Sequence, residues 1–144
     1  MKKFIDHFAI GDSIMKKPLK ALVGASAIFG VMAISFPAFA GSYNGVCEAT
    51  NGGEVCLYQY DATSGPIYDT LYSKPSYTGS TFYGTSTLID NNAASAWNRD
   101  PDTQVKFFFG ANYTGAMLYA GGGQKVGFVK EISSHCFASN VACP

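Results

Sequence analysis

Short runs of aromatic and β-branched residues, separated by Gly, Asn, Asp and Pro, fill the chain beyond residue 54. Such side chains favour the pleated surface of a β-sheet, and the residues between the runs are turn formers. The same region contains no persuasive helical pattern. We therefore predict an all-β fold, a sandwich or a small barrel. The expected strands lie at 55–60, 67–72, 104–109 and 116–119, with shorter ones near 87–89, 94–98, 126–129 and 132–136.

An aromatic residue followed by four others and then Tyr-Thr-Gly occurs twice, beginning at Tyr72 and at Phe108. A Gly at this place suits a hairpin that bends over its sheet with positive φ, with an aromatic ring covering the bend. A competing alignment pairs the hairpin at 55–72 with the hairpin at 104–119 and treats 75–82 as an insertion. Both alignments predict two repeated units, and the choice between them stays open at this point.

The first 40 residues have the features of an export signal. A cationic stretch at 15–20 precedes an apolar run at 21–36, and Ala38-Phe39-Ala40 supplies a small-x-small cleavage pattern. The apolar run, about 16 residues long, is shorter than the roughly 20 residues that span a bilayer as a helix. We predict cleavage after Ala40 and a secreted, extracellular product that has no membrane contact once the signal is removed.

Three parts are expected: the signal at 1–40, an N-terminal segment at 41–54, and one domain at 55–144. After residue 40 the chain carries 5 basic and 8 acidic residues, a formal charge of −3, and its cations are scattered. A nucleic-acid binder needs a clustered basic face that neutralises phosphates, so this class is excluded. We expect a monomer.

Four cysteines follow the signal, and an even number of cysteines in a short exported chain predicts disulfides. Cys47 with Cys56, and Cys136 with Cys143, would close two short local loops. We prefer this pairing. The alternative, Cys47 with Cys143 and Cys56 with Cys136, would tie the two ends of the domain together.

Several segments together carry a family resemblance. Phe108, followed by four residues and then by Tyr113-Thr114-Gly115, forms a pattern that resembles the βγ-crystallin Greek-key motif. With the other segments it is similar to peptidase inhibitor family I36, a group of secreted bacterial proteins. The segments that carry this second resemblance are Cys56-Leu57-Tyr58, Asn91-Asn92-Ala93-Ala94-Ser95-Ala96-Trp97-Asn98-Arg99, Asn112 to Gly115 and Ile132-Ser133-Ser134-His135.

The resemblance implies one βγ-crystallin-like double Greek-key β-sandwich, stapled by disulfides. It also implies a secreted inhibitor of extracellular metallopeptidases, with a thermolysin-like enzyme as the candidate partner. Killer-toxin-like relatives suggest the alternative, an antimicrobial or cell-wall carbohydrate-binding module whose partner is a cell-wall glycan. Either function acts by binding, and we expect no enzyme, because no nucleophile accompanies His135, the one histidine after the signal.

Inhibitors in this family hold their binding loop with a disulfide inside the domain, and this chain has no Cys between Leu57 and His135. The short clipped loop that remains starts at Cys136-Phe137-Ala138. Phe137 would offer a bulky apolar side chain to the protease. The alternative, which we favour, is that the clip holds the C-terminus and Phe137 belongs to the edge of the core.

The resemblance further suggests calcium, because many crystallin-type domains bind it through an Asn/Asp pair followed by Ser or Thr. Asn91, Asn92 and Ser95 fit this pattern, although Ala96 replaces the final Ser. We expect no cofactor, with calcium as the one candidate. The alternative role for Ser95, and for Ser133 in the second unit, is to hydrogen-bond the folded hairpins.

Overall fold

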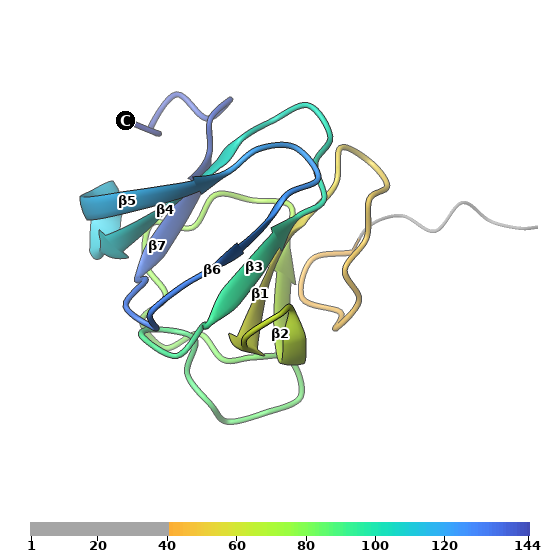
Figure 1. Ribbon diagram of the computed structural model, residues 1–144, viewed down its shortest axis with the longest axis vertical. Coiled ribbons are helices and arrows are strands. Elements are labelled where there is room, and N and C mark those ends of the chain that lie inside the picture. Colours follow the sequence, from red (N-terminus) through yellow and green to blue (C-terminus); the bar gives the residue numbers. More distant parts are fainter. Residues whose placement is uncertain (1–40) are drawn as a thin grey trace, which may run out of the picture. The chain divides into compact units, whose positions relative to one another are not determined.

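The computed structural model describes residues 41–144, and the expected signal at 1–40 lies outside the described residues. These residues form seven β-strands and one short 3-10 turn (Figure 1). Their bounds are β1 Val55–Tyr60, β2 Ser64–Thr70, β3 Ser95–Asn98, β4 Val105–Gly110, η1 Ala111–Tyr113, β5 Thr114–Ala120, β6 Lys125–Gly127 and β7 Ser134–Phe137. The described part of the chain contains no helix long and apolar enough to cross a membrane.

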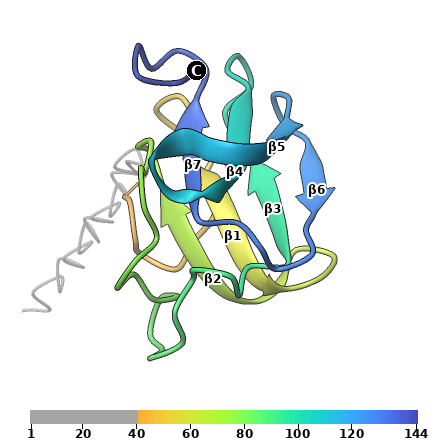
Figure 2. The same cartoon turned by 90° about the vertical axis from the view of Figure 1, so that its left-hand side faces the viewer.

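The strands form two antiparallel sheets, as expected for an all-β sandwich. One sheet has the order β2-β1-β3-β6 and the other the order β5-β4-β7, and Figure 2 shows both. Alternate residues of each strand face the space between the sheets. The core there is made of aliphatic and aromatic side chains, among them Leu57, Ile89, Phe107, Phe128 and Ile132.

The two sheets are built from a repeated unit. In the first hairpin Tyr58 pairs with Ile67, and a bulge precedes the bend. In the second hairpin Phe108 pairs with Met117, and a bulge lies at the same place. The alignment of the hairpin at 55–72 with the hairpin at 104–119 is therefore confirmed. The alignment that begins at Tyr72 is wrong, because the segment after Tyr72 forms no hairpin strand.

A serine fastens each folded hairpin to the last strand of its unit, β3 in the first unit and β7 in the second. In the first unit the Ser95 hydroxyl donates to the Tyr60 carbonyl (2.7 Å) and accepts from the Thr63 amide (3.0 Å). In the second unit the Ser134 hydroxyl donates to the Gly110 carbonyl (2.7 Å) and accepts from the Tyr113 amide (3.2 Å). The expected role of Ser95 is confirmed, and in the second unit the role belongs to Ser134 rather than to Ser133.

The first hairpin also requires glycine at its bend. Gly65 has a φ of +80°, and a Cβ added there would meet the Tyr60 ring at 2.3 Å. The Tyr60 ring thus covers the bend at Gly65, whereas the sequence pattern placed the first such glycine at Gly79, where no atom lies within 4 Å of an added Cβ. Gly115 occupies the same place in the second hairpin with a φ of +82°.

The two units exchange a strand, which makes the architecture a pair of interlocked Greek keys. β6 of the second unit pairs with β3 of the first unit. The reciprocal strand of the first unit is reduced to a single bridge between Lys74 and His135 of β7. Beyond this bridge, one further backbone hydrogen bond joins the two segments, from the Tyr77 amide to the Ser133 carbonyl (2.9 Å).

The expected strand at 87–89 is not formed. This segment makes only one bridge, between Thr81 and Leu88, across a tight turn. Ile89 is buried in the core. Leu88 is 48 % exposed, so burial accounts for Ile89 alone, and neither residue belongs to a sheet.

Both predicted local disulfides are present. Cys47 is bonded to Cys56 on β1, and Cys136 on β7 is bonded to Cys143. The first attaches the N-terminal segment to the sheet that holds β1, and the second closes the C-terminal loop. The alternative pairing between the two ends of the domain is wrong.

Candidate functional site

The expected binding loop at Cys136-Phe137-Ala138 begins inside a sheet. Phe137 is the last residue of β7 and pairs with Val105 of β4. Its side chain is 7 % exposed and packs in the hydrophobic core. As folded, this side chain is not available to a protease pocket, which favours the interpretation that the clip holds the C-terminus.

The calcium candidates lie at the start of β3. Asn91 is exposed and has a φ of 55°, while the side chain of Asn92 donates to the Asp90 carbonyl. Ser95 is buried, and its hydroxyl both donates and accepts a hydrogen bond within the hairpin. The Ser95 oxygen therefore has a structural task already. Among the described residues no group of three His, Cys, Asp or Glu side chains is arranged to hold a metal ion.

His135 is fully buried between the sheets. Its Nδ1 lies 2.8 Å from the Tyr77 hydroxyl, and its Nε2 lies 3.0 Å from the Tyr72 carbonyl. Burial lowers the pKa of His135 to about 4, against the raising effect of the hydrogen bond with Tyr72. The imidazole is therefore neutral near pH 7 and closed off from any substrate, which suits a structural role.

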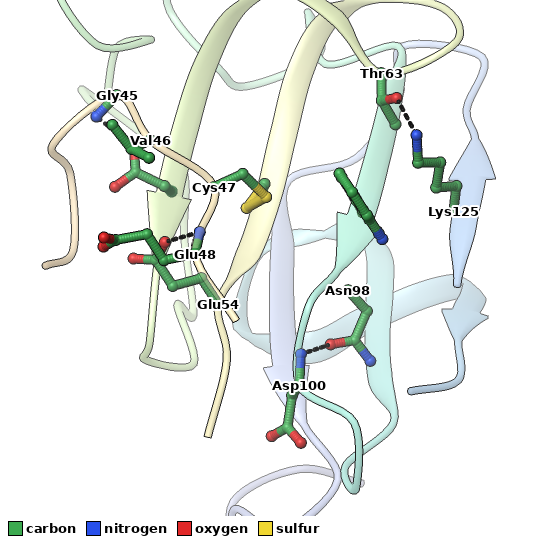
Figure 3. The surroundings of a disulfide bond; sticks show 12 residues. Gly45, Val46, Cys47, Glu48, Glu54, Thr63, Asn98, Asp100 and Lys125 are labelled. Atoms are coloured by element: carbon green, nitrogen blue, oxygen red, sulfur yellow. Dashed lines mark hydrogen bonds between the residues drawn. A yellow bond between two sulfur atoms is a disulfide. The ribbon is translucent and has the colours of Figure 1, made fainter. Parts of the chain in front are cut away.

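The N-terminal segment covers the outer face of β1 and β2. The Asp69 carboxylate of β2 accepts from the amides of Asn44 (2.7 Å) and Gly45 (2.9 Å). The Glu54 carboxylate accepts from the Glu48 amide (2.9 Å), and Figure 3 shows this bond next to Cys47. Burial, and the nearby Asp69 charge to a smaller extent, raise the pKa of Glu54 to about 7.

The N-terminal segment and the connection between β2 and β3 together close the edge of the first sheet. The Tyr43 amide donates to the Asp69 carbonyl (2.8 Å), and the Tyr83 amide donates to the Ile67 carbonyl (2.6 Å). Both acceptors belong to β2, the edge strand of its sheet. β2 also contains Pro66, a residue that discourages further pairing at an edge.

The edge of the second sheet is open. β5 is the edge strand there, and no backbone group of residues 114–119 hydrogen-bonds to any described residue on its outer side. Six of its seven residues are exposed, including Met117 (45 %) and Tyr119 (60 %). The strand contains no charged residue and no proline. An edge of this kind is a template for pairing with another extended chain.

Pairing across the hairpin gives β5 a defined set of contact side chains. Met117 pairs with Phe108 and Tyr119 pairs with Lys106, so Met117 and Tyr119 project from one face of the sheet. Leu118 pairs with the core residue Phe107 and lies at the margin of the other face. The sequence predicts a strand here but no binding surface, because nothing in the local pattern shows which edge stays uncovered.

Comparison with solved structures finds βγ-crystallin domains. One, from a study of the evolution of the eye lens βγ-crystallin domain fold, is 20 % identical with a TM-score of 0.55, over 67 % of this chain and 95 % of that one. An archaeal βγ-crystallin is 19 % identical with a TM-score of 0.46, over 60 % of this chain and 99 % of that one. At such identity the first likeness shows the fold alone.

The sequence was also compared with curated proteins and with the profiles of protein families. A search of curated proteins finds no match. The profile of peptidase inhibitor family I36 matches residues 45–120, more than half of the chain, from the N-terminal segment to the end of β5. Together with the βγ-crystallin fold, this match confirms the resemblance seen in the sequence: the chain belongs to peptidase inhibitor family I36.

Proposed function

We propose that this protein is a secreted inhibitor of a metallopeptidase and that it binds the enzyme with the open edge strand β5. The observation that carries the proposal is the exposure of β5, which is extended, apolar and unpaired on its outer side. Peptidase substrates are polypeptide segments, and an extended segment adds to an exposed strand through main-chain hydrogen bonds. β5 offers such a segment in a folded protein.

An inhibitor must hold its binding segment rigidly, because a flexible segment in the same place would be cleaved as a substrate. β5 pairs with β4 from Thr114 to Ala120, and Ser134 fastens the bend of the hairpin. A strand held in this way loses little conformational freedom on binding, which lowers the entropic cost of association. The flanking sheet also keeps the strand from adapting to the geometry that cleavage requires.

The side chains of β5 indicate that the partner is a peptidase whose pocket selects apolar residues. Met117, Leu118 and Tyr119 are bulky, and none of the cations after residue 40 lies on the strand. A trypsin-like pocket requires Arg or Lys, whereas a thermolysin-like pocket takes apolar side chains. We therefore propose a thermolysin-like metallopeptidase as the partner, with the export signal placing the inhibitor outside the cell.

The test is a titration of thermolysin, with trypsin as the comparison enzyme. We expect stoichiometric inhibition of thermolysin and none of trypsin. Met117→Lys places a charge on the edge and is expected to weaken inhibition by at least about tenfold, the scale of losing one central interface contact. Val129→Lys, at an exposed residue outside the strands, is the matched control and should inhibit normally. Full thermolysin activity at excess protein, or equal effects of the two variants, would contradict the proposal.

A further inference from the structure

A groove of about 460 Å³ lies between the two disulfide-closed loops, away from β5. One wall is the tip of the Cys47–Cys56 loop, and the other wall is the start of the Cys136–Cys143 loop. The connection after β2 and the turn after β3 complete the lining. The lining residues are Asn51, Gly52, Gly53, Leu71, Tyr72, Ser73, Asp100, Phe137, Ser139 and Asn140.

The walls of this groove are fixed before any ligand arrives. A Cβ added at Gly53 would lie 2.2 Å from the Arg99 carbonyl oxygen, so the first loop sits directly against the turn after β3. The Phe137 amide donates to the Ser73 hydroxyl (3.0 Å), which joins the second loop to the connection after β2. Each loop is also closed by its own disulfide. A site built in advance avoids the entropic cost of ordering on binding.

The groove combines one exposed ring with groups that hydrogen-bond in both directions. Tyr72 is 69 % exposed at its edge. Asn51 and Asn140 bring side-chain amides, which both donate and accept, and Ser139 brings a hydroxyl. Oδ1 of Asp100 accepts from the Asp102 and Thr103 amides, and Oδ2 has no partner among the described residues.

The charge of the lining residues argues against an anionic ligand. Asp100 is the one charged residue among those that line the groove, and no cation lies there to hold a phosphate or a carboxylate. Amides and a carboxylate can bind hydroxyl groups, because a hydroxyl donates to a carboxylate or amide oxygen and accepts from an amide N–H. The C–H face of a sugar ring suits an aromatic side chain such as Tyr72. The volume lies within the range of small-ligand sites.

From this geometry we propose that the groove binds a neutral oligosaccharide, with Tyr72 stacking on a sugar ring and Asn51, Asp100 and Asn140 contacting its hydroxyl groups. This binding is separate from peptidase inhibition, because the groove shares no residue with β5. It gives the protein a second function, attachment to a glycan surface while β5 stays free for an enzyme.

The test measures binding of the oxidised protein to chitohexaose and cellohexaose by calorimetry, and retention on insoluble chitin by sedimentation. We expect the unaltered protein to bind at least one of these glycans. Tyr72→Ala should weaken that binding about tenfold, the scale of one lost aromatic contact. Asn51→Gly removes an amide at a residue whose φ of 55° glycine adopts without strain, and should weaken binding about threefold.

Tyr119→Ala is the matched control, since it removes an exposed tyrosine from β5 instead of from the groove. Tyr119→Ala should keep glycan binding and lose thermolysin inhibition. Tyr72→Ala should lose glycan binding and keep thermolysin inhibition. Failure of the unaltered protein to bind any of the three glycans would overturn the proposal, whatever its effect on thermolysin. Equal loss of glycan binding in Tyr72→Ala and Tyr119→Ala would overturn it as well, because the groove would then have no special part.

Discussion

The two Greek-key units share one plan, but they differ at their outer edges. In the first unit the edge strand β2 is closed by Tyr43 and by Tyr83. In the second unit the edge strand β5 has no such cover among residues 41–144. Both hairpins bend with a positive-φ glycine and a serine fastening, so the plan itself does not demand an open edge. The difference shows that the first unit holds the N-terminal segment at its edge, while the second unit leaves its edge strand free, as the proposed binding surface requires.

The largest expected effect concerns a buried group that only the second unit has. His135 of β7 pairs with Phe107 in the second unit, whereas Ala96 pairs with Leu57 in the first. The folded pKa of His135 lies below that of an unfolded histidine, so its contribution is complete above about pH 6.5 and is lost as the pH falls toward 4. We expect the free energy of unfolding to fall by up to about 3 kcal/mol over this window.

Urea unfolding followed by the fluorescence of Trp97, the single tryptophan, measures this free energy at each pH. His135→Gln removes the titrating group and should flatten the acid limb of the profile, whatever its effect on absolute stability. An unchanged acid limb in the variant would contradict the assignment.

The next effect compares the two bends. Gly65→Ala adds a Cβ that meets the Tyr60 ring at 2.3 Å, whereas at Gly115 the nearest atom lies at 3.3 Å. Both changes place alanine at positive φ, which costs about 1 to 2 kcal/mol. The ring contact should bring Gly65→Ala to about 3 kcal/mol. Thermal unfolding with calorimetry ranks the two variants, and a larger loss for Gly115→Ala would show that the Tyr60 ring moves aside freely.

The serine fastenings should be equivalent in the two units. Ser95→Ala and Ser134→Ala each remove two hydrogen bonds and leave one carbonyl and one amide without a partner. We expect each to lower the free energy of unfolding by about 2 kcal/mol. Chemical denaturation of both variants checks this, with Ser86→Ala as an exposed control. Losses that differ by more than about twofold would break the symmetry between the units.

The last prediction tests how the N-terminal segment is held on the first unit, and it is read as a local effect on that segment. Glu54 has a raised pKa, so it contributes most to stability below pH 4.5, and this contribution is lost as the pH rises through about 7. Glu54→Gln should therefore flatten the decline of stability between these pH values. The effect should be confined to the N-terminal segment, and amide hydrogen exchange at Glu48, whose N–H bonds to Glu54, is the measurement. Exchange at Glu48 that has the same pH dependence in both proteins would contradict this.

Local chemistry predicted much of the fold. The run from Val55 to Tyr60 was expected as a strand and is one, because it combines β-branched and aromatic residues, which suit a pleated sheet. The two disulfides were expected between near neighbours, since short loops close easily. The strand expected at 87–89 is absent because Ile89 is buried without joining a sheet, and a sequence pattern does not distinguish burial from strand pairing.

The candidate sites were harder to predict. Phe137 appeared as a bulky apolar residue in a clipped loop, yet the fold turns it into the core. The surface on β5 and the groove at Tyr72 each depend on segments far apart in the chain. No local pattern near Met117 shows that its strand lies at an open edge.

By itself, the sequence determined the all-β character, the presence of repeated hairpins, the preference for local disulfides and the family. These depend on short-range properties: the β-branched and aromatic residues, the turn formers and the spacing of cysteines. Only the tertiary structure decided which of the two hairpin alignments holds, which sheet edge is covered, and where a groove forms. Those features arise when distant segments pack together, and the free energy that selects them is shared among residues that no single stretch of sequence contains.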